Sequence, residues 1–283
     1  MEYNIAQGET LGRYLWMSDG RTEAAVALDY GIRIVHFSCR GMKNLFYEQP
    51  KDADSLSTAE GWRIHAGHRL WLAPEGEADY YPDNLPVSYE RKENGAVLCQ
   101  PEDPWLHVNK RMELTFLADG TLQVDHIVQN TDDKTRRCAL WAVTSTAAGG
   151  RASVPFAWSG CEEEKYQPCR FLSLWGTTSL NDRRITFTPE GLDARQAPGD
   201  DYFKMGLQVR EGRAVLLNFG QRMTLQFGFA PGSTYPDNGC NFELYLCRQM
   251  MELETLSPLY LLEPGQSAAH RELWRVEPVS PQM

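Results

Sequence analysis

The sequence predicts an all-β protein, a sandwich or barrel of mostly antiparallel strands with one or two short helices. Short runs of alternating apolar residues recur along most of the chain, and turn residues such as Asn-Gly and Asp-Gly separate them at close spacing. Only two brief segments, 52–60 and 248–254, have a helical pattern. No linker or low-complexity run divides the 283 residues, of which 42% are hydrophobic, so we expect a single domain, residues 1–283, around a large core.

Most of the expected strands are paired as hairpins. Residues 22–39 are predicted to form two short strands broken at Tyr30-Gly31. The predicted hairpins are 87–100, 110–130 and 203–220, and further strands follow at 223–232 and 259–277. Asn94-Gly95 is the strongest turn signal, because this pair suits tight hairpin turns. Asp119-Gly120 and Glu211-Gly212 mark the turns of the two hairpins that follow.

Charge and cysteine content argue against several classes of protein. The 38 acidic residues outnumber the 28 Lys and Arg, and the net charge of −10 argues against nucleic acid or an anionic membrane surface as a partner. The first ten residues lack the basic and apolar regions of a signal peptide, and no apolar run is long enough for a membrane helix. The seven cysteines form no CxxC pair, so we expect reduced thiols in a cytoplasmic protein.

The segment HAGHRLWLAPE, residues 65–75, is a dense cluster of polar and aromatic residues that raises the question of a metal site. On a helix, His65 and His68 would share a face, and Glu75 follows them. The glycines Gly61 and Gly67 instead predict an extended segment, in which positions 65 and 68 point to opposite faces. Because no HEXXH motif or cysteine ligand set supports a metal, we expect neither a metal nor another cofactor.

The same region has the composition of a sugar-binding site, which needs planar apolar surface for the ring and polar groups for adjacent hydroxyls. Residues of both kinds lie within 62–84, namely Trp62, Arg69, Trp71, Glu75, Tyr80, Tyr81, Asp83 and Asn84. The alternative is structural: His68 and Arg69 hydrogen-bond to nearby carbonyls, while Trp71 and Leu72 lie in the core.

The sequence YPDN occurs twice, at 81–84 and at 235–238. Pro-Asp-Asn is common turn chemistry, so two independent turns are the simpler interpretation. The alternative is that both loops rim one cleft and present Asp83 and Asp237 to a polar ligand.

Several glutamates near the C-terminal end lie among apolar residues rather than in a charged run. They are Glu243, Glu252, Glu254 and Glu263. A carboxyl group among apolar neighbours has a raised pKa, which suits acid–base catalysis near neutrality. We interpret Glu252 and Glu263 as surface residues of strands and Glu254 as functional. His126 and His36 are interpreted as satisfied structural residues.

Three segments resemble galactose mutarotases (aldose 1-epimerases) in motif and in order. LETLSP (253–258) is similar to the segment that carries their catalytic glutamate, FELYL (242–246) resembles the strand before it, and residues 126–145 resemble a third segment. The combination of GHRLWLAPE, YPDN and ELETLSP also resembles a bacterial family of unassigned function with the same fold. The resemblance covers residues 60–275 and implies a β-supersandwich with a sugar-binding cleft across one sheet.

The resemblance also implies roles in mutarotation, in which a base deprotonates the anomeric hydroxyl and an acid protonates the ring oxygen. Glu254 matches the base, His68 resembles the sugar-contacting histidine, and Arg69 resembles the arginine near the ring. Trp141 stands where mutarotases have the general-acid histidine, and an indole N–H does not titrate, so His68 or His65 would have to supply the acid. The residues expected to be catalytic are Glu254 and His68, and those expected to bind substrate are Arg69, Trp71, Glu75, Asp83, Asn84, Trp141, His65 and Glu243.

Two functions stay open at this point: an isomerase of the aldose 1-epimerase type, and a sugar-binding protein that has lost the chemistry, which Trp141 favours. A glycoside hydrolase or lyase using Glu75 and Glu254 is a third alternative, and it needs the two carboxyl groups about 5–10 Å apart. The expected partner is a small-molecule carbohydrate, and a homodimer stays open. The basic residues that leave room for a phosphate or carboxylate on the sugar are Arg63, Arg69 and Lys43.

Overall fold

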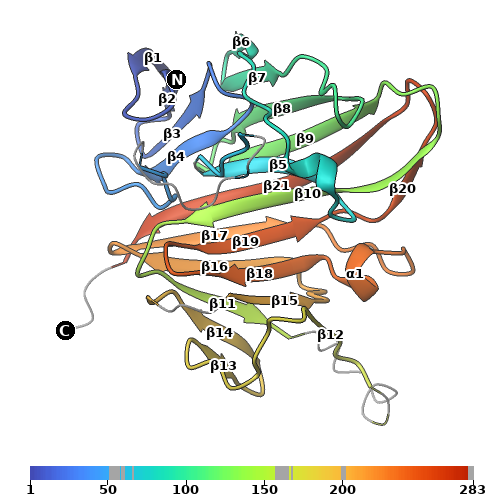
Figure 1. Cartoon of the computed structure of the whole chain (residues 1–283). Helices are drawn as coiled ribbons and strands as arrows, with labels where there is room; N and C mark the ends of the chain where they lie inside the picture. Colours follow the sequence, from blue (N-terminus) through green and yellow to red (C-terminus); the bar gives the residue numbers. More distant parts are fainter. Residues whose placement is uncertain are drawn as a thin grey trace.

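A computed structural model of the chain consists of two antiparallel β-sheets (Figure 1). The structure describes residues 1–50, 58, 61–65, 67–156, 166, 168–198 and 202–279. Within these residues the helices are η1 (Glu77–Tyr80), a 3₁₀ turn, and α1 (Pro236–Gly239). The predicted all-β class with one or two short helices is therefore confirmed.

The first sheet contains the strands that carry most of the predicted site residues. In spatial order its strands are β1 (Glu2–Gln7), β2 (Arg13–Ser18), β3 (Thr22–Ala27), β4 (Ile34–Cys39), β5 (His68–Ala73), β10 (Arg136–Thr146), β19 (Met251–Leu256), β18 (Phe242–Leu246), β15 (Phe203–Leu207) and β12 (Leu172–Leu174). One further strand, β20 (Tyr260–Leu262), pairs with β10.

The second sheet packs against the first. In spatial order its strands are β13 (Ile185–Phe187), β14 (Gly191–Arg195), β11 (Arg151–Pro155), β16 (Arg213–Asn218), β17 (Gln221–Phe227), β21 (Ser267–Pro278), β9 (Leu122–Asn130), β8 (Val108–Phe116), β7 (Gly95–Cys99) and β6 (Ser88–Lys92). No helix within the described ranges is long and apolar enough to cross a membrane.

The two strands predicted within 22–39 and two of the predicted hairpins are confirmed. The segment 22–39 forms β3 and β4, 87–100 forms β6 and β7, and 110–130 forms β8 and β9. In the second of these, Lys92 pairs with Gly95, so the chain reverses over two residues. Gly95 is required there because a Cβ would lie 1.8 Å from the carbonyl oxygen of Leu114.

The predicted hairpin 203–220 is wrong. The chain does turn at Gly212, but β15 belongs to the first sheet and β16 to the second. The turn therefore carries the chain from one sheet to the other. Glu211-Gly212 signals a reversal of direction, and a local signal of this kind does not specify which strand becomes the partner.

The helix expected over 248–254 is also wrong. Residues from Met251 onward form β19, which pairs with β10 on one side and β18 on the other. Met251 and Leu253 point into the core between the sheets, whereas Glu252 and Glu254 point to the opposite face. This is the two-residue period of a strand. The other expected helix, 52–60, lies outside the described residues except for Thr58.

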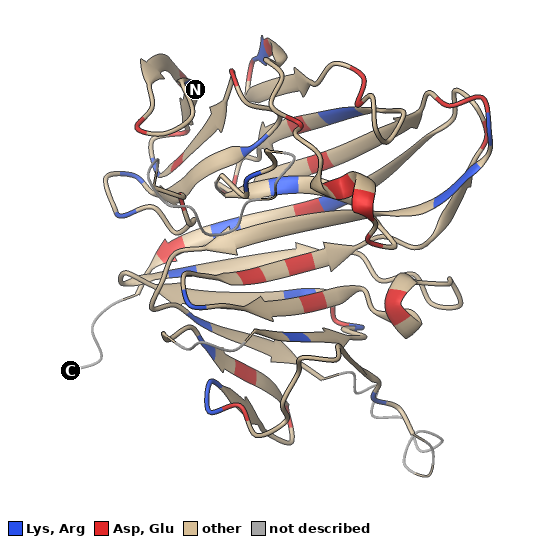
Figure 2. Ribbon diagram, in the orientation of Figure 1, with Lys and Arg blue, Asp and Glu red and all other residues tan. Residues whose placement is uncertain are grey.

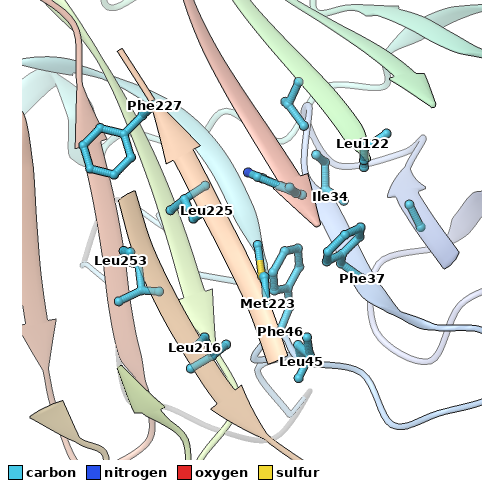
Figure 3. Packing of buried hydrophobic residues seen from close by; sticks show 14 of the residues in the cluster. Ile34, Phe37, Leu45, Phe46, Leu122, Leu216, Met223, Leu225, Phe227 and Leu253 are labelled. Atoms are coloured by element: carbon cyan, nitrogen blue, oxygen red, sulfur yellow. The ribbon is translucent and has the colours of Figure 1, made fainter. Parts of the chain in front are cut away.

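A large hydrophobic core holds the two sheets together. Phe37 of β4 and Leu253 of β19 come from the first sheet, and Leu216, Met223 and Leu225 come from β16 and β17 of the second (Figure 3). All five are nearly inaccessible to solvent. Because this packing fixes one face of each strand, it leaves the opposite face of the first sheet to carry polar residues.

Candidate active site

Five neighbouring strands of the first sheet bring charged side chains together on the face that points away from the core. Val143 of β10 lies opposite Arg69 of β5 on one side and Glu254 of β19 on the other, and Glu254 in turn lies opposite Glu243 of β18. The next row along the strands is Ser145, Glu252, Tyr245 and Lys204. Figure 2 shows acidic and basic positions close together on these central strands.

A pocket of about 290 Å³ opens on this face. Its aromatic walls are Trp62, Trp71, Tyr80, Trp141 and Tyr245, and its charged residues are Arg69, Glu75, Lys204, Glu252 and Glu254. The volume is at the lower end of the range for small-molecule sites, roughly 300–1,000 Å³. The pocket therefore fits one small polar ligand.

Glu254 is a buried carboxylate of this pocket, with 1% of its surface exposed. It accepts a hydrogen bond of 2.8 Å from the indole Nε1 of Trp141, and its Oε2 lies 3.4 Å from Nζ of Lys204. Burial raises the pKa of Glu254 to about 7, although the positive charge of Lys204 opposes this rise. Glu254 therefore exchanges its proton near neutral pH, which is the property of an effective general acid or base.

Lys204 lies at the centre of a group of carboxylates. Its Nζ is 3.0 Å from Glu243, 3.4 Å from Glu254 and 3.9 Å from Glu75. The same Nζ lies 4.4 Å from the centre of the Trp141 ring. Burial acts to lower the pKa of Lys204, but the carboxylates outweigh it and raise the pKa, so this side chain stays charged.

Arg69 forms the other basic part of the pocket. Its guanidinium lies 4.5 Å from the centre of the Trp71 ring and contacts Glu252 at 3.4 Å. Ser145 donates a hydrogen bond of 2.7 Å to the same carboxylate oxygen. Within the described residues, the buried donors Arg69 Nε and Trp62 Nε1 have no hydrogen-bond partner. Both belong to residues that line the pocket.

Six of the residues expected from the sequence come together here. Arg69, Trp71, Glu75, Trp141 and Glu254 line the pocket, and Glu243 lies against Lys204 beside it.

His68 does not lie in the pocket, contrary to expectation. It is fully buried on the opposite face of β5, where its Nε2 is 2.6 Å from Nε2 of His126. Successive residues of a strand point to opposite faces, so His68 cannot share a pocket with its neighbour Arg69. Burial also holds the pKa of His68 well below its usual value.

Asp83, Asn84 and His65 also lie outside the pocket. Asp83 forms a buried ion pair with Arg33. His65 contacts Asn84 at 3.1 Å, and both line a separate polar depression of about 520 Å³. Burial lowers the pKa of His65 to about 4.

The two YPDN sequences fit independent turns. Neither Asp83 nor Asp237 lines the pocket, and Asp237 adopts a left-handed backbone with φ of 50° in α1.

Among the described residues, one group has the composition of a metal site: His68, His126 and Glu272, whose ligand atoms lie within 4.8 Å of one another. His126 Nδ1 contacts a backbone carbonyl and must donate to it, so its Nε2 accepts from His68. The remaining ring nitrogen of His68 then accepts from the hydroxyl of Thr144. Hydrogen bonds thus account for all four ring nitrogens without an ion.

Two charged residues of the pocket were missed in the sequence. Lys204 was assigned no role, and Glu252, interpreted as a surface residue, is buried and binds Arg69. The signal for Glu252 was its spacing of two from Glu254, which places both on one face once the segment is recognised as a strand. Lys204 alternates with the apolar Phe203 and Met205 in the same way.

The fold is similar to those of several solved structures, of which the first two below are described as galactose mutarotase-like. A galactose mutarotase-like protein from Lactobacillus casei is 13% identical, with a TM-score of 0.59 over 93% of this chain and 100% of that chain. A second from Clostridium acetobutylicum is 11% identical, with a TM-score of 0.52 over 98% of each chain. A protein from Synechocystis sp. PCC 6803 is 14% identical, with a TM-score of 0.57 over 98% of this chain and 100% of that chain.

The chain therefore shares the fold of galactose mutarotase-like structures, and the resemblance drawn from the sequence is confirmed at the level of fold. No family model and no curated protein matches the chain.

Proposed function

We propose that this protein binds a monosaccharide or a monosaccharide derivative in the pocket and interconverts its anomers, with Glu254 as the base. The observation that carries the proposal is the position of Glu254, a buried carboxylate with a pKa near 7 on the floor of an aromatic pocket. The similarity of fold to galactose mutarotase-like proteins supports it.

The lining of the pocket supports a sugar as the ligand. Indole and phenol rings provide apolar surface for the C–H groups of a sugar ring, and carboxylates and cations hydrogen-bond to its hydroxyls. The buried donors Arg69 Nε and Trp62 Nε1 have no partner within the described residues. Buried polar groups are rarely left unpaired in a protein, so a ligand that offers acceptor oxygens would complete this site.

The chemistry follows from the same groups. Glu254 removes the proton of the anomeric hydroxyl, whose oxygen forms a carbonyl as the bond between C1 and the ring oxygen breaks. The bonding pair moves to the ring oxygen, and an N–H of Arg69 stabilises the negative charge that develops there. Rotation about the C1–C2 bond and the reverse step then give the other anomer.

A second candidate function is sugar binding without catalysis, and Trp141 favours it. Trp141 stands where the mutarotases it resembles have a general-acid histidine, and its indole donates to Glu254. No histidine lines the pocket among the residues that the structure describes. In this case Glu254 acts only as a hydrogen-bond acceptor for a sugar hydroxyl.

We do not include glycoside hydrolysis in the proposal. Nζ of Lys204 contacts both Glu75 and Glu254, so the two carboxylate oxygens cannot be further apart than the sum of 3.9 and 3.4 Å. That separation is compatible with a hydrolase pair. The ammonium group, however, occupies the space between them that a water or leaving group would need.

Proton NMR of a panel of sugars, with and without the protein, tests the proposal. We expect saturation transfer from the protein to the bound sugar, and accelerated exchange between the signals of the α and β anomers. Glu254→Gln keeps an acceptor for Trp141 but removes the base, so exchange should fall by about 10²–10⁴-fold while saturation transfer remains. Glu263→Gln, at an exposed position outside the pocket lining, is the control.

Saturation transfer without anomer exchange in the native protein would leave sugar binding and reject the isomerase. Neither signal with any sugar would reject both functions.

A further inference from the structure

Acidic groups outnumber basic groups around the pocket. The carboxylates are Glu75, Glu243, Glu252 and Glu254, and the cations among the described residues there are Arg69 and Lys204. Asp237 adds a further negative charge that acts on Glu243.

Both cations are already engaged by carboxylates. Arg69 contacts Glu252, and Lys204 contacts Glu243, Glu254 and Glu75. A phosphate or carboxylate on the ligand would therefore meet only cations that already contact carboxyl groups. Its negative charge would also raise further the pKa of Glu243 and of Glu254, which are both raised already.

The other basic residues considered for an anionic sugar lie elsewhere. Arg63 lines the separate polar depression, and Lys43 lies over the ring of Phe219.

An acceptor beside the pocket also lacks a partner. Oε1 of Glu243 is buried without a hydrogen-bond partner within the described residues, although the residue is only 1% exposed. Its other oxygen contacts Lys204 at 3.0 Å. The side chain of Glu75 is 35% exposed at the rim, where it accepts a hydrogen bond from Tyr80. Burial raises the pKa of Glu243 well above its usual value, although Lys204 opposes this rise, and a positively charged donor would favour the ionised form. Glu75 can accept a hydrogen bond from the same kind of donor.

Aromatic rings surround the same space. The ring centres of Trp62, Trp71 and Tyr80 lie 5.2 to 5.6 Å from one another. The faces of such rings attract cations, most strongly those of tryptophan. Rings and carboxylates together form the type of site that recognises an ammonium group.

We infer that the ligand carries a positively charged amine, and that the preferred substrates of the pocket are amino sugars rather than sugar phosphates or sugar acids. The sugar part of this inference rests on the proposed function. The amine part rests on the four carboxyl groups at and beside the pocket, on the aromatic rings, and on the unpaired oxygen of Glu243.

Titration of tryptophan fluorescence at pH 7 with matched sugars tests the inference. The probes are the free hexose, its 2-amino and 6-amino derivatives, and its 6-phosphate, in both the gluco and galacto series. We expect the better of the two amines to bind about tenfold more tightly than the free hexose, and the phosphate about tenfold more weakly. A phosphate that binds as tightly as the amine would overturn the inference.

The variant Glu75→Gln identifies the source of the preference. It removes one carboxylate from the rim, so the affinity for the amine should fall by about three- to tenfold more than the affinity for the free hexose. Glu77→Gln is the matched control, because Glu77 is exposed, two residues away and outside the pocket lining. An equal loss of affinity for both sugars in Glu75→Gln would show that charge is not the cause.

A second series separates this inference from the proposed function. Cyclohexylamine, cyclohexanol and cyclohexanecarboxylate have rings of similar size and differ in charge. If no sugar binds but the amine of this series binds most tightly, the proposed sugar function fails and the preference for positive charge stands. If the three compounds bind equally, the preference for positive charge is wrong, whatever the sugars do.

Discussion

The acid–base behaviour of Glu254 depends on its burial and on two neighbours that oppose the effect of burial. Burial favours the neutral acid and raises its pKa, whereas Lys204 and the indole N–H of Trp141 favour the carboxylate. The pKa near 7 is therefore the balance of a large desolvation effect and a close positive charge. Removing the positive charge of Lys204 should therefore raise the pKa of Glu254.

We expect Lys204→Met to raise the pKa of Glu254 by about one to three units, because the positive charge that stabilises the carboxylate is lost. Carbon-13 NMR titration of the glutamate carboxyl groups, with the Glu254 signal assigned from Glu254→Gln, measures this pKa directly. Lys43→Met is the control, since Lys43 is exposed and lies over Phe219 outside the pocket. A midpoint that stays at pH 7 in Lys204→Met would mean that burial alone sets the pKa of Glu254.

Individual residues of the pocket differed in how far the sequence revealed them. Glu254 stood out because a carboxylate among apolar residues needs a reason to be there. Lys204 carried no such signal, because its partners come from three segments that only the folded sheet brings together. His68 was placed in the site by resemblance, although the alternation of a strand already conflicted with placing Arg69 and Trp71 beside it.

At the level of elements, the position of β5 depends on the close approach of the backbone of Gly67, just before the strand, to the backbone of Ile34 in β4. Gly67 has φ of 60°, donates a hydrogen bond to Tyr47 and accepts one from Ser145. A Cβ at this position would lie 1.9 Å from the carbonyl oxygen of Ile34. The backbone of the neighbouring strand therefore allows only glycine here, and this contact fixes the register that turns Arg69 and Trp71 toward the pocket.

We expect Gly67→Ala to lower the free energy of unfolding by about 2–4 kcal/mol, from the unfavourable φ and from the clash together. Gly41→Ala is the matched control: Gly41 has φ of 74°, but no atom lies within 4 Å of the added Cβ. That variant should lose only about 1 kcal/mol. Urea unfolding measures both, and equal losses in the two variants would show that the approach to Ile34 does not constrain β5.

The elements that the sequence predicted correctly are those whose partner is the next strand along the chain. The strands at 22–39, 87–100 and 110–130 pair locally, so turn residues and alternation were sufficient. The segment 203–220 failed because β15 and β16 find their partners in different sheets. β19 was taken for a helix although residues 251–254 alternate between apolar and charged, which is the period of a strand.

At the scale of the whole molecule, stability depends on buried groups that are neutral in the folded state. Burial lowers the pKa of His126 to about 4 and of His270 to about 3. Their folded pKa values lie below the unfolded value of about 6.5, so stability from these residues is present above pH 6.5 and is lost as the pH falls. Burial raises the pKa of Glu272 and of Glu254 to about 7. These two carboxyl groups therefore make the fold more stable, relative to the unfolded chain, as the pH falls.

The two effects oppose each other between about pH 4.5 and 6.5. In this range the unfolded chain holds more protons on its histidines, while the folded chain holds more protons on Glu272 and Glu254. Glu272 lies in the hydrogen-bond network between the sheets, where it accepts from Thr255 and Trp274. The carboxyl groups thus offset part of the acid sensitivity that the buried histidines cause.

Replacing Glu272 by Gln should remove one of these offsetting groups. Between pH 6.5 and 5 the free energy of unfolding of Glu272→Gln should then fall more steeply with acid than that of the native protein, by about 1.4 kcal/mol per pH unit for the one proton concerned. Urea unfolding at half-unit intervals of pH gives the slope, which is independent of any constant loss of stability from the substitution. The exposed Glu263→Gln should keep the native slope, because it removes no buried carboxyl group. Parallel curves for Glu272→Gln and the native protein would mean that Glu272 is ionised in the fold, and that its burial is compensated by its hydrogen bonds to Thr255 and Trp274 rather than by a proton.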